Sequence, residues 1–319
     1  MYFYHDLTPI PGDKIKRTVF RADLAPIPAT LEIELRLDDG NRDYLKEGLD
    51  IYAGPDRAYR CVLAQLYRRN AEQTGRMLES MHMTCVQREL QPLTFVRERA
   101  VYLEDTTLTD IYRACGAQLA KPIIGDVAIP RFTCLIGDTP TFGVAKLFQE
   151  HRGVLRVNKD DDLEFMRLES LFEQKPSLVV PANVTEEIES GFIERHEIPW
   201  FFGIDETNAF IFGNTDKARH ARYKHGSEED VLRNMSRVLI QAKRLRIDYT
   251  VSLRAGDAAK IAGGGGVGND PLPSNDPVPT WGDDEEDIFT VLTSAGVYSS
   301  GTDGLPIEQY TRVWLGSLI

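Results

Sequence analysis

The segment that decides the fold reads TLTDIYRACGAQL at residues 107–119, TPTFGVAKLFQEHRG at 139–153 and VLRVNKDDDLEFMR at 154–167. The first part opens with a capping box at Thr107, and its apolar residues recur at helical spacing. The second part has a good N-cap in Thr139, a proline at the first helical position and a natural stop at Gly153. The third part is a strand, a polar turn and a second strand. This order of helix, helix and hairpin contains no catalytic motif and favours a structural assembly protein over an enzyme.

Composition and charge narrow the class of protein. With 319 residues, 42% of them apolar and 27% charged, the chain is globular and long enough for two or three domains. Its formal net charge of −12 argues against sequence-independent binding of nucleic acid. The four cysteines form no C-x-x-C pair, which favours folding in a reduced, intracellular site. No apolar run is long enough for a signal peptide or a membrane span, so we expect neither secretion by the usual route nor a membrane-spanning segment.

Two long alternating strands predict a β-rich α+β fold. In residues 31–37 and again in residues 244–254, every second residue is apolar, as in a strand with one buried face. The polar faces of these two strands carry Glu32, Glu34, Arg36, Arg246, Asp248 and Thr250. We therefore predict a first β-rich region at 1–105, an inserted α/β unit at 106–172 and a second β-rich region at 173–319.

Weaker local patterns complete the secondary structure. Apolar runs on both sides of a Gly-Pro-Asp turn predict a hairpin of residues 50–53 and 58–64. Residues 71–80 are compatible with a short helix, and a capping box at Ser227 predicts a helix over about 228–240. Residues 262–287 are rich in glycine, proline and acidic residues and predict a long loop. Closing strands are predicted at 288–292 and 310–315.

The candidate motifs for chemistry each have a simpler structural explanation. Gly263, Gly265 and Gly268 match G-x-G-x-x-G, but Asn-Asp-Pro follows where a phosphate-binding helix would have to begin. The carboxylates of residues 160–164 lack the spacing of an EF-hand loop and fit a solvated hairpin turn. We therefore predict no catalytic residue, no cofactor and no metal site. Sequence alone leaves open a pair of carboxylates that are distant in the chain and act on a glycosidic bond.

One dense basic run stands out in this acidic chain. Residues 217–225 read KARHARYKH and contain the four basic residues Lys217, Arg219, Arg222 and Lys224. The two histidines of the run lack a third ligand for a metal, and a nucleic-acid surface would need more aromatic residues than Tyr223. The run is best interpreted as an exposed, partner-facing arm.

The polar faces of the two long strands allow two interpretations. Each face either contacts solvent or, in a wide assembly, lines a channel shared between copies of the chain. The residues alone do not decide between the two.

Three segments resemble a known family. Residues 142–168 contain GVLRV, a polar turn and LEFMRL, residues 251–257 read VSLRAGD, and residues 25–28 read APIP before the first long strand. In these segments and in their order the chain resembles the baseplate hub proteins of contractile phage tails, of the late-control-protein-D type. The same fold forms the hub part of type VI secretion spike proteins. The resemblance implies two tube-protein-like β-barrel domains with the small α/β unit inserted between them.

The resemblance also implies an assembly. A homotrimer would place six barrels around one axis and would join a sixfold tail tube to a threefold central spike. Implied partners are a tail tube protein or tube-extension ring, the spike protein and baseplate wedge proteins, in a virion tail made in the host cytoplasm. Phage DNA would pass through the channel without specific binding. The polar side chains of the segments 31–37 and 244–254 would then face the lumen. There, Glu32 and Glu34 would keep the channel wall from binding DNA phosphates.

The chain departs from the family pattern in its long loop at 262–287. It also ends at Ile319 without a spike or lysozyme domain, so we expect the spike to be a separate polypeptide. Two other functions stay open: a tail-associated cell-wall hydrolase, and a β-rich module that binds a host ligand.

Overall fold

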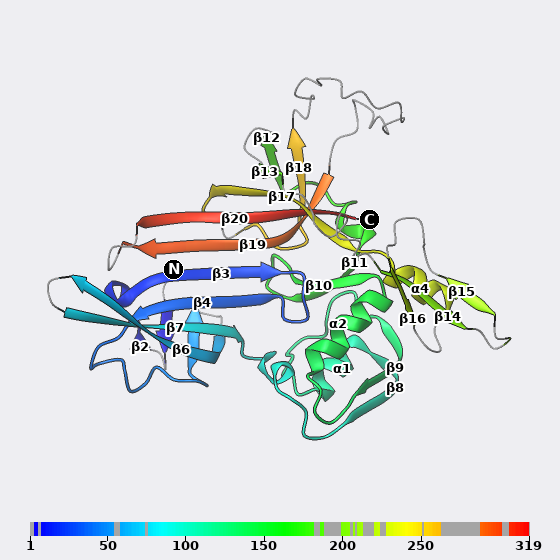
Figure 1. The fold of residues 1–319 in the computed structure, drawn as a ribbon, viewed down its shortest axis with the longest axis horizontal. Coiled ribbons are helices and arrows are strands. Elements are labelled where there is room, and N and C mark those ends of the chain that lie inside the picture. Colours follow the sequence, from blue (N-terminus) through cyan, green and yellow to red (C-terminus); the bar gives the residue numbers. More distant parts are fainter. Residues whose placement is uncertain are drawn as a thin grey trace.

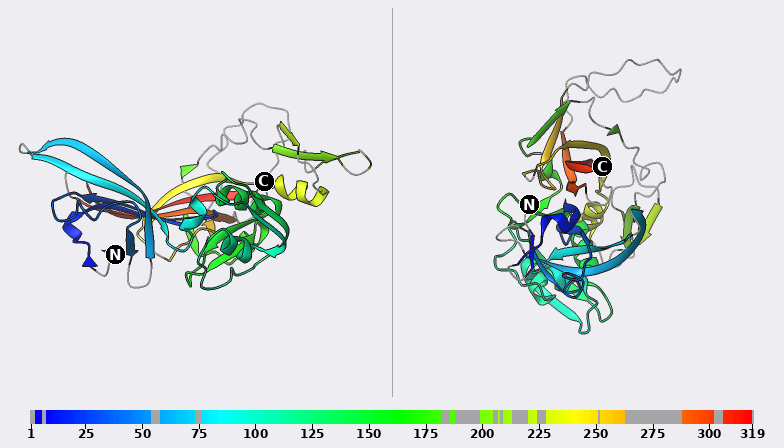
Figure 2. Two further views of the ribbon diagram at one scale, coloured as in Figure 1. Left: turned by 90° about the horizontal axis from the view of Figure 1, so that it is seen from below. Right: turned by 90° about the vertical axis from the view of Figure 1, so that its left-hand side faces the viewer.

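The protein is a β-rich α+β protein (Figure 1). A computed structural model describes residues 3–5, 8–53, 58–73, 76–181, 186–187, 199–204, 207, 209–212, 220–223, 228–250, 252–262, 288–301 and 306–318. Within these residues, strands from both ends of the chain form one large sheet, and an α/β unit lies at one end of it (Figures 1 and 2).

The large sheet has thirteen strands, and its main path runs β13-β17-β20-β19-β3-β4-β7-β6-β5-β1-β2. Its N-terminal strands are β1 (Phe3–His5), β2 (Thr8–Pro9), β3 (Ile15–Asp23), β4 (Ala29–Arg36), β5 (Asp50–Ala53), β6 (Ala58–Gln73) and β7 (Arg76–Gln87). Its C-terminal strands are β12 (Leu178–Pro181), β13 (Glu186–Glu187), β17 (Leu239–Asp248), β18 (Ala258–Ala262), β19 (Ile288–Ser300) and β20 (Ile307–Leu318). Off the main path, β18 pairs with β19 and with β12.

The two β-rich regions are joined through β3 and β19. These strands pair antiparallel from Arg17 opposite Ser299 to Asp23 opposite Thr293. The β-rich α+β class is confirmed, but the picture of two separate closed barrels is wrong: the described strands form one open sheet. The physical reason is that β3 lies at the edge of the N-terminal strands and β19 at the edge of the C-terminal strands. Each edge has a row of backbone donors and acceptors, and the two rows form hydrogen bonds with each other.

The two larger cores of the sheet lie on the same side of it. The core of the N-terminal half includes Leu31, Ile33 and Leu35 of β4, all fully buried. The core of the C-terminal half includes Leu245 of β17 and Val313 of β20. Residues that pair directly across two strands point to the same side of a sheet. The register from β4 through β3, β19 and β20 to β17 therefore places these core residues on one face.

The inserted α/β unit has its own core. It contains β8 (Val101–Thr107), β9 (Ala128–Cys134), β10 (Gly153–Val157), β11 (Leu163–Arg167), α1 (Leu108–Ala114), α2 (Pro140–Glu150) and the short 3-10 helix η2 (Gln91–Thr94). Two further 3-10 turns are η1 (Gly12–Lys14) and η3 (Glu169–Leu171). The predicted order of helix, helix and hairpin is confirmed, whereas the β8–β9 pair was not predicted. Leu90 and Leu93 are buried in this core, so the unit extends upstream of residue 106.

Local chemistry explains the unit's elements. The hydroxyl of Thr107 accepts a hydrogen bond of 3.2 Å from the backbone N–H of Asp110, as expected of the capping box. In the hairpin turn, the side-chain oxygen of Asn158 accepts from the N–H groups of Asp160 and Asp162 at 2.9 and 3.0 Å. Asp161, between them, has a φ of 62°, which Asp tolerates better than most residues.

The C-terminal half also contains a small second sheet and a helix. The sheet is formed by β14 (Pro199–Ile204), β15 (Phe210–Phe212) and β16 (His220–Tyr223), and α4 (Glu229–Met235) lies beside it (Figure 1). The helix predicted over about 228–240 ends at Met235, and Leu239 already belongs to β17. The cause is tertiary: Leu239 pairs with Leu318 of β20, and this pairing prevails over the local helical pattern.

The β5–β6 and β6–β7 hairpins test two of the weaker local predictions. The predicted hairpin of 50–53 and 58–64 is confirmed as β5 and β6. The short helix at 71–80 is wrong, because these residues belong to the β6–β7 hairpin, in which Arg68 pairs with Glu79 and Gln73 with Arg76. Cross-strand pairing overrides a weak local propensity here. The predicted loop begins at Ala262, the last residue of β18, and its residues 263–287 lie outside the described residues.

Candidate functional site

The polar residues of the two long strands lie on one face of the large sheet. Glu32 of β4 pairs with Val19 of β3, which pairs with Val297 of β19, and that residue pairs with Tyr310 of β20. Tyr310 pairs with Asp248 of β17. A single row of cross-strand neighbours therefore runs from the first predicted strand to the second, on the side opposite the two larger cores. The middle of the row, Val19, Val297 and Tyr310, is buried in a small apolar cluster, and the charged residues lie on either side of it. We call this side the polar face.

The β4 part of the polar face is a network of paired charges. The carboxylate of Glu34 lies 3.0 Å from the ammonium of Lys16, whose side chain is only 2% exposed. The same carboxylate accepts a hydrogen bond of 3.1 Å from the hydroxyl of Ser80. Glu32 lies 3.8 Å from the imidazole of His82. Glu34 is therefore a structural partner of a buried cation and not a free surface charge.

The β17 and β20 part of the polar face is built from arginines on aromatic rings. The guanidinium carbon of Arg246 lies 3.7 Å from the centre of the Tyr310 ring, and its Nη2 lies 3.7 Å from the carboxylate of Glu308. Arg312 lies 5.8 and 5.9 Å from the rings of Tyr310 and Trp314. The rings and the salt bridge fix these cations against the sheet, since cation–π contacts favour guanidinium groups lying over a ring.

The structure therefore brings together most of the residues predicted for this face. By register, Glu32, Glu34, Arg36, Arg246 and Asp248 share it. Thr250 does not share it, because the strand predicted at 244–254 already ends at Asp248. The N–H of Thr250 donates to the hydroxyl of Thr311, a residue that pairs on the other side of the sheet.

Sequence reasoning missed the cations of the central strands. Arg17 and Arg21 of β3 and Arg312 of β20 lie on the polar face by register. The alternation of Arg17, Val19, Arg21 and Asp23 was the signal that could have revealed them. They add to the predicted arginines Arg36 and Arg246, so the face carries charges of both signs that are in part paired with each other.

The predicted partner-facing arm is mostly outside the described residues. Of Lys217, Arg219, Arg222 and Lys224, only Arg222 belongs to a described element, β16. Its strand pairs parallel with β14, with Arg222 opposite Phe201. The role of the arm stays a prediction.

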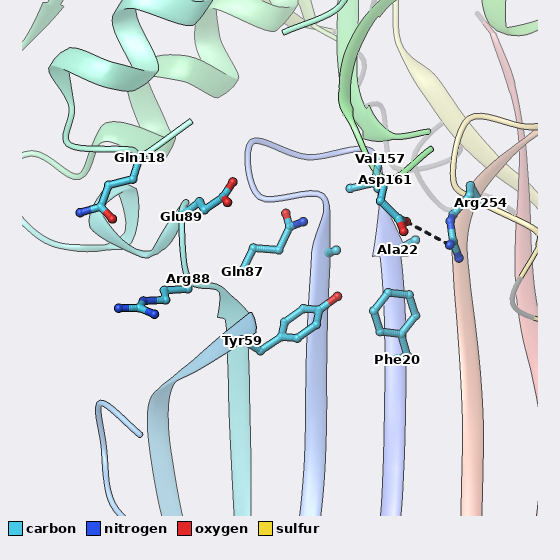
Figure 3. Close-up of a pocket in the computed structure, with 11 residues that line it drawn as sticks. Phe20, Ala22, Tyr59, Gln87, Arg88, Glu89, Gln118, Val157, Asp161 and Arg254 are labelled. Carbon is cyan, nitrogen blue, oxygen red and sulfur yellow. Dashed lines mark hydrogen bonds and ion pairs between the residues drawn. The ribbon is translucent and has the colours of Figure 1, made fainter. Parts of the chain in front are cut away.

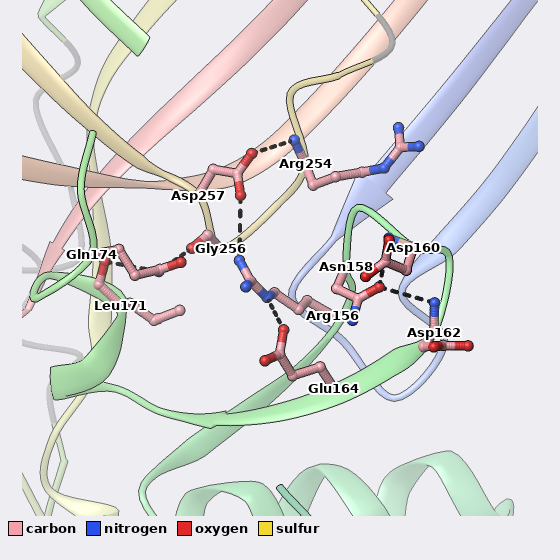
Figure 4. Close-up of polar contacts among 10 residues, drawn as sticks. All are labelled: Arg156, Asn158, Asp160, Asp162, Glu164, Leu171, Gln174, Arg254, Gly256 and Asp257. Atoms are coloured by element: carbon pink, nitrogen blue, oxygen red, sulfur yellow. Dashed lines mark hydrogen bonds and ion pairs between the residues drawn. The ribbon is translucent and has the colours of Figure 1, made fainter. Parts of the chain in front are cut away.

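A buried polar junction connects the α/β unit to the large sheet (Figure 4). The guanidinium of Arg156 in β10 donates to Glu164 at 2.8 Å and to Asp257, before β18, at 3.3 Å. In the opposite direction, Arg254 donates to Asp161 of the hairpin turn at 3.3 Å. Each side thus supplies one arginine and one aspartate. The side chains of Arg156 and Asp257 are only 11% and 5% exposed, so this junction is held away from water.

Gly256 is required at this junction. Its φ is +83°, and a Cβ atom there would lie 2.8 Å from Cδ of Arg156. The carbonyl of Gly256 also accepts a hydrogen bond of 2.7 Å from the side chain of Gln174. Any other residue would be strained in this backbone conformation and would displace the arginine.

A cavity of about 480 Å³ opens beside the junction (Figure 3). Phe20 and Tyr59 lie on its sheet side, with ring centres 6.1 Å apart, and Asp161 and Arg254 form part of its wall. The lining contains no histidine or cysteine. Buried Cys115 lies in the core of the α/β unit, where burial raises its pKa to about 11 and keeps the thiol protonated.

Neither a metal-binding cluster nor a membrane-spanning helix occurs among the described residues. No group of three or more His, Cys, Asp or Glu side chains in this part of the chain could hold a metal ion. None of the helices found there has the length and apolar character needed to cross a membrane.

Comparisons with known proteins identify the fold. Neither a protein-family model nor a curated protein sequence matches the chain. The tail protein from Neisseria meningitidis MC58 has a TM-score of 0.61 at 7% identity, over 99% of this chain and 95% of that one. The 43 kDa tail protein of prophage MuSo2 from Shewanella oneidensis has a TM-score of 0.61 at 7% identity, over 98% and 97%. Prophage tail protein gp18 from Listeria monocytogenes EGD-e has a TM-score of 0.53 at 8% identity, over 95% and 88%. The chain has the fold of phage tail proteins.

Within this phage-tail fold, two of the segments that resembled hub proteins meet in space. Residues 153–167 form the β10–β11 hairpin, and residues 252–257 lead into β18. They are about a hundred positions apart in the chain, yet Arg156 and Asp257 join them directly.

Proposed function

We propose that the chain is the structural hub of a contractile phage-tail baseplate. Three copies would surround the tail axis, join the sixfold tube to the threefold spike, and leave a channel for DNA. The observation that supports this proposal is that both long strands present polar residues on one face of a continuous sheet, opposite its two larger cores. The middle of this face is a small buried apolar cluster around Val19 and Tyr310, and charged residues lie on either side of it. In a tail-protein fold, a sheet with charged residues on the side opposite its main cores suits the lining of a tube.

The proposed channel lining is made of the polar face. Glu32, Glu34, Arg36, Arg246 and Asp248 would face the lumen, together with the arginines of β3 and β20. Because the charges are of both signs and several are paired, passing DNA phosphates would meet few free cations. DNA would pass without specific binding.

The open edges of the sheet support assembly into a ring. Beyond Arg60, the described part of β6 pairs only with β7, which leaves its other edge open as far as Gln73. At the other end of the sheet, the described residues of β13 cover β17 at Lys243 and Arg244. Unpaired edges of this length favour strand addition, and head-to-tail pairing of two different edges produces a closed ring when the rotation between copies closes. Pairing of the β6 edge with the β17 edge of the next copy would close the wall.

In this proposal the partners are a tail tube protein or tube-extension ring, a central spike protein and baseplate wedge proteins. The protein would be part of the virion, in the tail baseplate, after synthesis in the host cytoplasm. Its role would be structural, without catalysis. The basic run at Lys217, Arg219, Arg222 and Lys224 would contact one of these partners.

The first test is the mass of the purified protein by light scattering over a range of concentrations and salt. We expect a species of three times 36.0 kDa that forms as the concentration rises. The second test mixes the protein with the tail tube protein of the same phage and examines the product by electron microscopy. Rings that stack on the end of the tube are expected. The hub proposal would be contradicted if the protein stayed monomeric under all conditions and also did not bind to the ends of the tail tube.

A further inference from the structure

A second cavity, of about 610 Å³, lies on the core side of the large sheet. Its walls come from the hairpin turn at Lys159, the segment at 175–178 that enters β12, and the connection from β17 to β18 at 250–254. The three walls belong to segments far apart in the chain, and Arg254 connects two of them through its hydrogen bond to Asp161 of the hairpin turn. The cavity is separate from the polar face.

The charge of this cavity is opposite to that of the whole chain. Three cationic side chains line it, Lys159, Lys175 and Arg254, and no carboxylate is among its described lining residues. The chain as a whole has 49 acidic and 37 basic residues. Arg254 donates to Asp161 at 3.3 Å, so its charge is balanced from outside the cavity. The ammonium groups of the two lysines remain as the net positive charge of the lining.

Hydroxyl groups and an apolar floor accompany these lysines. Lys159 donates to the hydroxyl of Ser177 at 3.4 Å, and the hydroxyls of Thr250 and Ser252 lie 2.8 Å apart. Apolar side chains, including buried Leu253 and half-buried Ile247, form the floor. A ligand that fits this lining has anionic groups that accept hydrogen bonds and an apolar part between them.

We propose that this cavity binds an acidic peptide segment of a partner protein, with two carboxylates flanking an apolar side chain. The carboxylates would contact Lys159 and Lys175, and the apolar side chain would contact the floor at Leu253. A phosphate group fits less well, because the arginine that could bind it with two parallel hydrogen bonds is engaged by Asp161. The proposal does not depend on the hub function, since it concerns the core side of a single copy.

The test measures binding of a fluorescein-labelled peptide, Asp-Leu-Asp-Leu-Asp, to the full chain by fluorescence anisotropy. The matched peptide Asn-Leu-Asn-Leu-Asn should bind at least tenfold more weakly. The variants Lys159→Gln and Lys175→Gln should each weaken binding of the acidic peptide about two- to fivefold, and the double variant about tenfold, as for exposed ion pairs. Both lysines are exposed, so the variants should fold like the parent.

The control variant is Lys146→Gln, which removes the same charge from the exposed side of α2, outside the cavity. It should leave the affinity unchanged. Equal binding of the two peptides, or an equal loss with Lys146→Gln and the double variant, would overturn the proposal. Inorganic phosphate is tested as a competitor. If millimolar phosphate displaces the peptide and the double variant removes this effect, the cavity is a phosphate site and the peptide assignment is wrong.

Discussion

Arg156 is the residue on which the connection between the α/β unit and the sheet depends. Replacing it with Met would keep most of the volume but would leave Asp257, 5% exposed, without its cation. Breaking a buried pair from one side costs about 3–5 kcal/mol, so we expect Arg156→Met to lower the free energy of unfolding by that amount. Urea denaturation measures it. Arg131→Met is the control: Arg131 and Glu104 are 69% and 56% exposed, and the loss should stay below about 1 kcal/mol.

Glu34 and Glu32 differ in role although they are two residues apart on one strand. Glu34→Lys would place a cation beside Lys16, which is 2% exposed, and we expect a loss of about 3–5 kcal/mol. Glu32→Lys should change the free energy of unfolding by less than about 1 kcal/mol. The side chain of Glu32 is 33% exposed, and its contact with the imidazole of His82 is long, at 3.8 Å. Thermal unfolding of the two variants distinguishes them. Equal stability would show that the contact between Glu34 and Lys16 is unimportant.

At the scale of elements, β6 and β3 should differ in hydrogen exchange. Both neighbours of β3 are strands of the same sheet, so its backbone amides are paired and should exchange slowly. Beyond Arg60, β6 has a partner on one side only, and every second amide on its open edge should exchange fast in the monomer. If β6 pairs with a second copy, these amides become protected as the concentration rises. Mass spectrometry of exchanged peptides from 61–73 measures this, with β3 peptides as the internal control. Protection that does not depend on concentration would argue against strand pairing between copies.

At the scale of the whole molecule, the proposed hub makes the polar face the surface that DNA would meet. Glu32→Lys adds a cation to this face without disturbing the cores, and we expect it to slow DNA release from phage particles that still assemble. Release is measured by nuclease sensitivity of the ejected DNA after a trigger. Glu32→Gln removes the negative charge without adding a positive one and should have a smaller effect. Unchanged release in both variants would mean that residue 32 does not face the DNA.

Local signals in the sequence were sufficient for the elements whose contacts are close in the chain. Thr107 caps α1 through a residue three positions away, and the hairpin turn is closed by Asn158 within the same few residues. The alternation of β4 predicted which side chains are buried, because a strand with one packed face repeats every two residues. The same local reasoning failed at 71–80 and 236–240, where pairing with distant strands decides the conformation.

The sequence by itself determined the β-rich class, the order of the α/β unit and the amphipathic character of β4, because these depend on periodicity and on capping within a few residues. Only the tertiary structure decided that β3 and β19 join both halves into one sheet, that the polar residues of both halves share a face, and that Arg156 meets Asp257. The physical reason is that backbone hydrogen bonds are the same for every sequence. The register and partner of a strand are therefore selected by the packing of side chains from segments far apart in the chain, which no local pattern contains.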